Sequence, residues 1–521
     1  MPLNELLPKA IKLHPKKEAV VCGKTRMDYQ TFGERVWRLC QGLISLGLGR
    51  NDRMAILHEN SNEFLEAYFA AAHLGVILVP LNFRLSAREL GMILNDSETR
   101  ILIAQGRFRK KVDELHASVS APDRIIWTRR DFEISGTGEL DYESLLAGQT
   151  PTVPSDPGIQ DDDVAQLYYT SGTTGRPKGV MLTHKNVKSH ALGTIAELHL
   201  TDSDRWFHVA PLFHLADAWA TFAITWVAGT HVILPTFEPL KVLQMIERER
   251  ITLSNLIPTM LNMMVNHPEV DNFDYSSLRV ILSGGAPIAP ETVRKIIETL
   301  KCDYIQTYGM TETSPYLTLS ILKDHLKTLP REEQLRFKAK TGREFINVSL
   351  RVVDNMGNDV APDSQQVGEI IVKGDTVTPG YWHLPEETQG AIRDGWLYTG
   401  DLAVMDEEQY VAIVDRKKDM ILTGGENVYS TEVENVLYQH EAVLEAAVIG
   451  VPDPHWGEAV KACVVLKEGC TATEEEIIAF CKKDLAGYKA PKSVDFLETL
   501  PKTGSGKIYK KGLRDPYLQR S

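Results

Sequence analysis

Strand-like and helix-like patterns of apolar residues alternate along the chain from about residue 53 to residue 309. Short runs of branched apolar residues are typical of buried strands, and longer segments with apolar positions three or four apart are typical of helices. The expected strands lie at 53–60, 76–82, 99–104, 205–213, 230–235, 253–258, 278–288 and 302–309, and the expected helices lie at 62–75, 87–98, 239–250 and 290–300. This alternation predicts βαβ units and parallel sheets, so we expect two related sheets packed through helices.

The pattern changes at about Asn347. Short extended runs separated by Gly, Pro, Asn and Asp follow, which predicts a small β-rich subdomain with hairpins. After Asp415, a charged run, a Gly-Gly turn and mixed strand and helix patterns indicate a compact α+β domain. We therefore expect an α/β fold with a large domain at residues 1–416 and a small C-terminal domain at residues 417–521.

One apolar stretch, residues 218–237, contains no Asp, Glu, Lys or Arg and is nearly long enough to span a bilayer. Gly229, His231 and Pro235 interrupt it. We therefore expect a buried helix of about 14 residues, a turn and a short core strand, and no integral membrane segment. The first residues of the chain mix apolar positions with charges and prolines, so we expect no secretion signal there.

Charge and cysteine content narrow the functional classes. The 521 residues include 57 Lys and Arg against 70 Asp and Glu, a formal net charge of -13, so we expect no nucleic acid partner. The six cysteines form no C-x-x-C pair and belong to no His cluster with metal-ligand spacing. We expect reduced, buried thiols and a cytoplasmic location. The sequence leaves a homodimer open.

The strongest local signal for chemistry is the segment YTSGTTGRPKG, from Tyr169 to Gly179. Its glycines allow close approach of a ligand to the backbone, its hydroxyls supply donors, and Lys178 supplies a cation. That combination suits a polyphosphate, although the segment is not a Walker A loop. The predicted phosphate-binding residues are Thr170, Ser171, Gly172, Thr173, Thr174, Gly175 and Lys178.

Further motifs follow this loop along the chain. They are PLFH (211–214), SGGAPI (283–288), YGMTET (308–313), YTGD (398–401), DRKKDMILTGGENV (415–428) and PKTGSGK (501–507). Together with the loop, these motifs resemble the series found in the adenylate-forming superfamily of acyl- and aryl-CoA synthetases, luciferases and adenylation domains. The resemblance covers essentially the whole chain and implies an acyl-CoA synthetase.

The resemblance implies a site for ATP and Mg²⁺. Glu312 would be the metal ligand, since magnesium prefers hard oxygen ligands. Lys507 would bridge the substrate carboxylate and the α-phosphate, and with Lys178, Thr311 and His214 it completes the predicted catalytic set. The predicted nucleotide-binding residues beyond the loop are Gly284, Gly285, Ala286, Tyr308, Gly309, Thr311, Asp401 and Arg416.

The acid site is predicted from PLFH and the residues after it. By resemblance, His214 would lie at its mouth, and the expected pocket residues are Phe213, His214, Trp219, Phe222 and Met310. Asp217 departs from the Gly or Asn that relatives often carry. The segment FHLADAW is similar to the FHxNAW variant of medium- and long-chain fatty acyl-CoA synthetases, so an aliphatic acid is our first choice. Aryl, branched and short acids stay open.

For the C-terminal part, the resemblance implies a mobile lid domain with a hinge near Lys418, and it implies that the β-rich subdomain is barrel-like. Gly424 and Gly425 would leave a slot for the pantetheine arm of CoA. The predicted reaction joins a small-molecule carboxylic acid to AMP with release of pyrophosphate, and CoA then takes the acyl group as a thioester. Two alternatives stay open: transfer to a carrier protein, and a non-catalytic nucleotide-binding protein.

Overall fold

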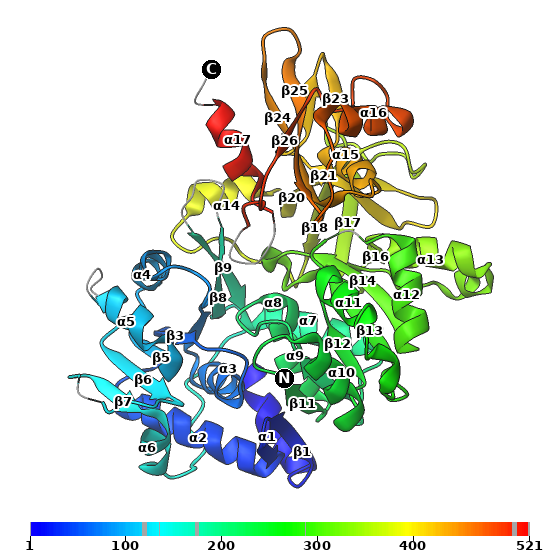
Figure 1. Ribbon diagram of the computed structural model, residues 1–521. Helices are drawn as coiled ribbons and strands as arrows, with labels where there is room; N and C mark the ends of the chain where they lie inside the picture. The colour runs from blue at the N-terminus through cyan, green and yellow to red at the C-terminus, as the bar shows by residue number, and fades with distance from the viewer. Residues whose placement is uncertain are drawn as a thin grey trace. The chain divides into compact units, whose positions relative to one another are not determined.

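The computed structural model describes residues 2–116, 122–134, 136–171, 177–286, 288–502 and 508–518. Figure 1 labels the helices and strands of the chain, and contacts divide it into two compact units. Unit 1 consists of Met1–Leu350 and Val372–Leu397, and unit 2 consists of Arg351–Ile371 and Tyr398–Ser521. The predicted boundary at residue 416 and hinge near Lys418 describe where one domain would rotate, whereas the two units are defined by their contacts. The boundary and the hinge therefore stay predictions.

The larger sheet of unit 1 has nine strands in the order β16-β15-β14-β13-β12-β10-β11-β1-β2. Its strands are β1 (Glu18–Cys22), β2 (Thr25–Asp28), β10 (Arg205–His208), β11 (Thr230–Ile233), β12 (Leu253–Asn255), β13 (Val280–Gly284), β14 (Asp303–Gly309), β15 (Tyr316–Leu319) and β16 (Arg343–Glu344). The strands from β1 to β14 in this order are parallel to one another, and β2, β15 and β16 are antiparallel at the edges. The predicted parallel sheet is therefore confirmed.

Three helices cover one face of this sheet. They are α10 (Pro239–Arg248), α11 (Pro258–Val265) and α12 (Pro290–Leu300), and their apolar side chains share one core with β10, β11, β13 and β14. Each helix begins at a proline, whose fixed φ and missing N–H suit the first helical turn. Other helices of unit 1 around this sheet are α1 (Leu6–Leu13), α7 (His184–Leu198) and α13 (Arg331–Ala339).

The second sheet of unit 1 has seven strands in the order β7-β6-β5-β3-β4-β8-β9. They are β3 (Arg53–Leu57), β4 (Ile77–Pro80), β5 (Ile101–Gln105), β6 (Arg124–Thr128), β7 (Glu139–Asp141), β8 (Val164–Ser171) and β9 (Pro177–Thr183). Only the β8–β9 pair, at one edge, is antiparallel. This edge matters because the glycine-rich segment connects β8 to β9.

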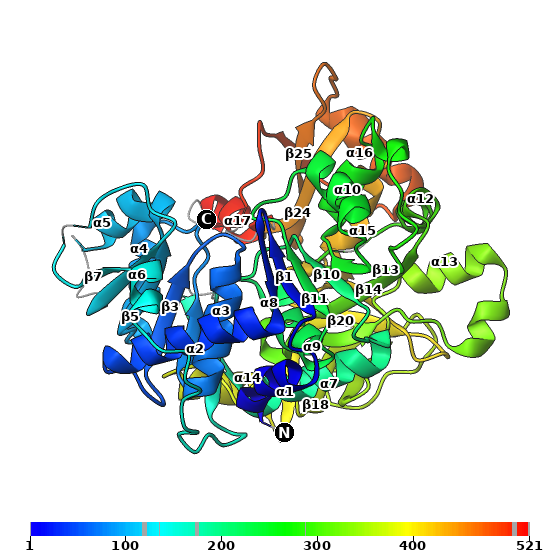
Figure 2. The same cartoon turned by 90° about the horizontal axis from the view of Figure 1, so that it is seen from below.

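Helices α4 (Ala87–Asp96) and α5 (Arg109–His116) pack on the second sheet in one core. The side chains of Ser86 and Glu89 form a capping box that begins α4. Helices α2 (Tyr29–Ser45), α3 (Asn62–Leu74) and α6 (Tyr142–Ala147) also belong to this part. Helices α1, α2 and α3 pack in succession, and α1 also contacts the helix α9 (Ala220–Trp226), as Figure 2 shows from below. The two sheets are thus joined through helices, as predicted.

The apolar stretch at 218–237 differs in detail from its prediction. Instead of one helix of about 14 residues, the chain forms α8 (Leu215–Ala218) and α9 with Trp219 between them, and β11 follows. Within the described ranges, no helix is long and apolar enough to cross a membrane.

A five-stranded sheet has the order β17-β18-β20-β19, with β21 paired to β20. Its strands are β17 (Val348–Val353), β18 (Gly368–Gly374), β19 (Ile392–Arg393), β20 (Trp396–Met405) and β21 (Val411–Arg416), and the helix α14 (Pro385–Ala391) precedes β19. The sheet begins where the sequence predicts the β-rich subdomain.

The last hundred residues form the predicted α+β pattern. Strands β22 (Ile421–Thr423), β23 (Glu426–Val428), β24 (Val443–Asp453), β25 (Gly457–Leu466) and β26 (Ser493–Phe496) make a second five-stranded sheet of unit 2. Helices α15 (Ser430–Leu437) and α16 (Glu474–Asp484) share one core with this sheet, and α17 (Lys510–Leu518) shares another.

Five of the six cysteines are buried, as expected, but Cys470 is exposed. It lies between β25 and α16, outside both cores.

Candidate nucleotide and acid sites

The strands β8 and β9, which flank the predicted phosphate loop in sequence, lie at the edge of the seven-stranded sheet. Strands β8 and β9 pair so that Thr170 is opposite Lys178 and Tyr169 is opposite Gly179. The hairpin brings both flanks of the motif to one place. Gly172, Thr173, Thr174 and Gly175 lie outside the described residues, as does the side chain of Ser171.

The Lys178 ammonium is held by an anion and an aromatic ring. It forms an ion pair with the carboxylate of Glu387 on α14, and its Nζ lies 5.4 Å from the centroid of the Tyr381 ring. The Lys178 side chain is 15% exposed, whereas that of Glu387 is 40% exposed. A mostly buried ammonium needs such partners, because desolvation of an unpaired charge is costly.

The same Tyr381 also contacts the predicted metal ligand. Its hydroxyl donates to Glu312 Oε1 at 2.9 Å, and the Glu312 carbonyl accepts from the Thr378 N–H at 2.8 Å. Burial, and then the adjacent Glu312 carboxylate, raise the pKa of Tyr381, so the phenol stays protonated and remains a donor. Two predicted catalytic residues, Lys178 and Glu312, therefore meet at one ring.

The predicted adenine wall lies at the ends of two neighbouring parallel strands. Gly284 of β13 pairs with Thr307 of β14, and a Cβ at Gly284 would lie 2.4 Å from Thr307 Oγ1. A Cβ at Gly309 would lie 1.7 Å from the Pro315 carbonyl oxygen, so only glycine fits either position. Ligands of open α/β sheets bind outside the carboxyl ends of the strands. Gly285 and Ala286 are exposed there, and Tyr308, Gly309 and Thr311 are partly exposed.

The donor set at this edge fits magnesium. Glu312 supplies a carboxylate, and Thr311 precedes it on the same short 3-10 helix. Mg²⁺ usually takes one or two carboxylates and completes its shell with waters and substrate phosphates. Glu312 is the residue that would hold the ion.

The residues of the predicted acid pocket lie before, between and on α8 and α9, and at the end of β14. His214 lies just before α8, and its carbonyl accepts from the N–H groups of Asp217 and Ala218. The remaining predicted aromatic side chains enter separate groups. Phe213 packs on Phe83, Trp219 on Trp206, His190 and Tyr316, and Phe222 on Tyr68 and Phe69. The assignment of these side chains to the acid pocket stays a prediction. Met310 lies at the end of β14, partly exposed.

A buried polar chain lies behind α8, and sequence reasoning missed it. The Asp217 side chain is 0% exposed; it accepts from Trp206 Nε1 at 3.0 Å and lies 2.6 Å from His208 Nδ1. His208 Nε2 is 2.9 Å from His231 Nδ1, and His231 Nε2 is 2.9 Å from Thr225 Oγ1. We call these five residues the Asp217 chain. The departure from the family motif at Asp217 is thus explained by contacts in the core.

Both ring nitrogens of each imidazole in the Asp217 chain have a hydrogen-bond partner. Burial, and then His208, hold the pKa of His231 well below its usual value, so His231 carries no charge at neutral pH. His208 Nδ1 donates to the Asp217 carboxylate, and the neutral His231 donates through one ring nitrogen and accepts through the other.

In unit 2, the predicted ribose residues form a pair. Asp401 of β20 is opposite Arg416 of β21, and Arg416 Nε donates to Asp401 Oδ1 at 2.7 Å. Asp401 is buried and the Arg416 side chain is about half-exposed. Lys418 is exposed in the turn after β21, and its carbonyl accepts from Arg514 Nη1 at 3.3 Å. Lys507 lies outside the described residues.

Gly424 and Gly425 form the two-residue turn of the β22–β23 hairpin. Their φ values are 60° and 85°, and Thr423 pairs with Glu426 across them. Such turns strongly favour glycine, because both residues have positive φ. A Cβ at Gly424 would also lie 2.9 Å from Trp456 Cε3. The hairpin turn by itself therefore requires glycine at both positions. The role of Gly424 and Gly425 in CoA binding stays a prediction.

Sequence reasoning also missed Tyr381 and Glu387. Both follow TPG in the segment TPGYWHLPEET, where the only local signal is Pro385, which begins a helix. The contacts of Tyr381 and Glu387 with Lys178 span about 200 positions of sequence, so no local spacing could have shown them.

Comparison with known proteins gives consistent results. A family described as AMP-binding enzyme matches residues 7–382, and one described as AMP-binding enzyme C-terminal domain matches residues 432–507. Feruloyl-CoA synthase of Amycolatopsis sp is 39% identical over 504 residues, 96% of each chain. The long-chain-fatty-acid–CoA ligase FadD13 of Mycobacterium tuberculosis is 34% identical over 519 residues, 98% of each chain. The crystal structure of ATP-bound MatB from Rhodopseudomonas palustris is similar with a TM-score of 0.87, at 32% identity and 99% coverage of each chain.

Proposed function

Because the chain belongs to the AMP-binding enzyme family and is an acyl-CoA synthetase of the adenylate-forming superfamily, we propose that it activates a hydrophobic monocarboxylic acid. As an acid–thiol ligase it uses ATP, Mg²⁺ and CoA. A medium- or long-chain fatty acid is the first choice, since the segment FHLADAW is similar to the motif of fatty acyl-CoA synthetases.

The reaction has two steps. A carboxylate oxygen attacks the α-phosphorus of ATP, the bond to pyrophosphate breaks, and an acyl adenylate forms. The CoA thiol then attacks the acyl carbon, loses its proton, and AMP leaves. Positioning and charge stabilisation can accelerate both steps without a protein nucleophile.

Residues of unit 1 would bind the nucleotide. Lys178 would hold phosphate oxygens, and Tyr308 with Gly284, Gly285 and Ala286 would hold adenine at the strand ends. Mg²⁺ bound by Glu312 would neutralise negative charge on the phosphates. The contact chain from Lys178 through Tyr381 to Glu312 carries this proposal, because it brings a phosphate-binding cation and a metal ligand together.

The remaining assignments rest on the motifs. Asp401 and Arg416 would bind ribose, and Lys507 would stabilise charge during adenylation. Rotation of the C-terminal domain about Lys418 would then replace Lys507 with Gly424 and Gly425 for the thioester step.

An acid panel tests this function. Purified protein with Mg-ATP is offered fatty acids of increasing length and aryl acids, each with and without CoA, and AMP and pyrophosphate are measured. We expect acid-dependent pyrophosphate release without CoA and steady AMP release with CoA. If no acid gives either product, the proposed function is wrong.

An aryl acid is the second candidate. Two observations favour it: the 39% identity to feruloyl-CoA synthase, and the aromatic side chains of His190, Trp219 and Tyr316 grouped beside α8. A single methylene changes binding in an apolar pocket by about 1–3 kcal/mol. The value of kcat/KM should therefore rise along the fatty acid series if the first choice holds, and it should peak at an aryl acid if the second holds.

A further inference from the structure

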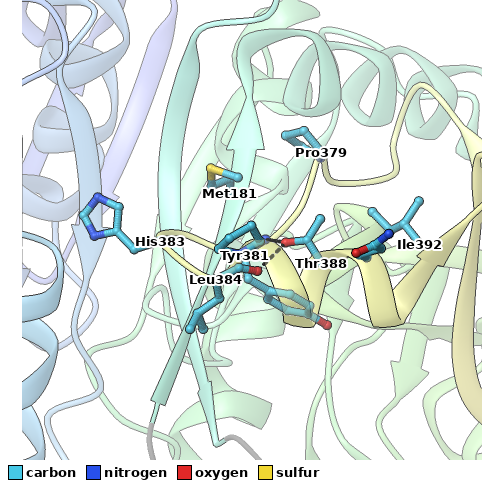
Figure 3. A pocket seen from close by; sticks show the side chains of 9 residues that line it. Met181, Pro379, Tyr381, His383, Leu384, Thr388 and Ile392 are labelled. Carbon is cyan, nitrogen blue, oxygen red and sulfur yellow. Dashed lines mark hydrogen bonds between the residues drawn. The ribbon is translucent and has the colours of Figure 1, made fainter.

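The surroundings of Lys178 include two residues without an assigned role. Glu387 is its ion-pair partner, and Tyr381 lies beneath its ammonium. Both residues line a cavity of about 380 Å³ together with Lys178, Glu386, Gly390 and Ala391. Tyr381 also lines the adjoining cavity of about 470 Å³ shown in Figure 3.

We propose that Tyr381 and Glu387 are further residues of the nucleotide site. Glu387 is the counter-anion of Lys178 until the phosphates of ATP displace it, and Tyr381 is a positioning residue that sets both Lys178 and Glu312. This inference rests on the proposed function, since it takes ATP as the anion that displaces Glu387.

The charges and exposures explain why the Glu387 contact is replaceable. Lys178 is mostly buried and keeps an anionic partner, whereas Glu387 is on the first turn of α14 and reaches solvent. When Glu387 is displaced, water can solvate its carboxylate. A polyphosphate offers several charged oxygens where Glu387 offers one carboxylate, so it outcompetes Glu387 for the ammonium.

Tyr381 is fixed from two sides, which suits a positioning role. Its N–H donates to Thr388 Oγ1 at 2.9 Å on the α14 side (Figure 3), and it forms a β-bridge with Val180 of β9. The next residue, Trp382, donates its N–H to the Gly179 carbonyl at 2.7 Å. The backbone of Tyr381 is therefore fixed between β9 and α14, and the contact with Glu312 orients its hydroxyl.

Binding measurements test the role of Glu387. ATP is titrated without metal into the wild-type protein, Glu387→Gln and the matched control Glu386→Gln, which removes the same charge one residue earlier. We expect Glu387→Gln to bind ATP about two- to fivefold more tightly, the factor that a partly exposed ion pair supports. The control should stay within about 1.5-fold of the wild type.

Two outcomes overturn the role of Glu387. Equal effects of both variants would mean that only overall charge matters. Weaker binding of ATP by Glu387→Gln would mean that Glu387 holds Lys178 in place for the nucleotide rather than competing with it. If the wild-type protein binds no ATP with or without Mg²⁺, the proposed function itself fails, and these comparisons are not reached.

The Mg²⁺ dependence of ATP binding tests Tyr381. Tyr381→Phe keeps the ring under Lys178 but removes the donor to Glu312. We expect the Mg²⁺ concentration for half-maximal enhancement of ATP binding to rise about three- to tenfold, while metal-free ATP binding changes less than twofold, because a hydrogen bond to a carboxylate is lost. Tyr142→Phe, which removes a phenol that donates to Glu66 at 2.6 Å, is the control and should leave both values unchanged. An unchanged Mg²⁺ dependence in Tyr381→Phe would overturn the positioning role.

Discussion

Two charged groups near the predicted sites are stabilised in opposite ways. Asp217 is completely buried, and its partners Trp206 and His208 are also buried in the sheet beneath α8. Lys178 is paired with Glu387, which reaches solvent on the surface of α14. The first group can exchange its partners only if the core opens, whereas the second can exchange Glu387 for a ligand with the fold intact.

This difference predicts whether a mutation changes stability or changes ligand binding and rate. Removing one member of a buried hydrogen-bonded network leaves other members unsatisfied and destabilises the fold. Removing one member of a partly exposed pair changes stability little. Changes in the Asp217 chain should therefore appear in unfolding experiments, and changes around Lys178 should appear in ligand binding and rate.

Lys178→Ala is expected to have the largest effect. The rate of acid-dependent pyrophosphate release should fall about 10²- to 10³-fold, as is typical when one preorganised charge stabiliser is removed. The free energy of unfolding should change by less than about 1 kcal/mol, because Glu387 can be solvated. Single-turnover assays and urea unfolding measure the two quantities. A large loss of stability in Lys178→Ala with an unchanged rate of pyrophosphate release would contradict the comparison.

Asp217→Ala should lower the free energy of unfolding by about 2–5 kcal/mol, because it leaves two buried N–H donors without an acceptor. Asp217→Asn is the matched control. Its amide can accept from Trp206 and donate to His208, and the two imidazoles can reverse their tautomers down to Thr225. Asn should therefore recover most of the loss. Equal destabilisation by Ala and Asn in urea unfolding would contradict the proton arrangement of the Asp217 chain.

The buried interior should also be sensitive to pH, through His190. Burial lowers the pKa of His190 to about 3, and its Nε2 accepts from the Tyr316 N–H at 3.3 Å. Between this pKa and the unfolded value of about 6.5, the unfolded chain binds more protons, so stability is complete above pH 6.5 and declines as the pH falls. His190→Gln should reduce the loss between pH 7 and pH 5 by about 2 kcal/mol. An unchanged pH profile would show that His190 does not contribute.

Lys418→Pro extends the comparison to unit 2 and should have the smallest effect. Hydrogen bonds described for this turn are donated by the N–H groups of Lys417, Asp419 and Met420, so proline at 418 leaves them in place. We expect normal adenylation and thioester formation slowed about tenfold, a barrier increase of about 1.4 kcal/mol. Separate single-turnover assays of the two half-reactions measure this. Equal slowing of both half-reactions would contradict the proposed hinge at Lys418.

The sequence predicts the elements of the fold well because they depend on local periodicity. The strands β3, β4, β5 and β10 to β14 and the helices α3, α4, α10 and α12 lie within or close to the expected ranges, whereas α11 was not predicted. The predicted glycines at 284 and 309 are also explained, since a Cβ at either position would collide with a neighbouring strand or loop. Such steric needs leave a mark in the sequence itself.

Contacts between distant segments could not be predicted in the same way. The motif predicts that Lys178 is a phosphate-binding cation, but no residue close to it in sequence points to Glu387 or Tyr381. Asp217 stands out in its motif, yet its side-chain partners, Trp206 and His208, lie on the separate strand β10. Tertiary packing sets the direction in which such a side chain points. The residue type at that one position does not reveal it.

The exposure of Cys470 has a practical consequence for following the C-terminal domain. Burial raises the pKa of Cys463 and Cys481 to about 11, and it raises the pKa of Cys22, Cys40 and Cys302 as well, so these thiols react slowly with maleimides near neutral pH. A fluorophore can thus be attached at Cys470 in the unaltered chain. Energy transfer from a labelled nucleotide to that dye would test the proposed rotation of the C-terminal domain in real time, turnover by turnover.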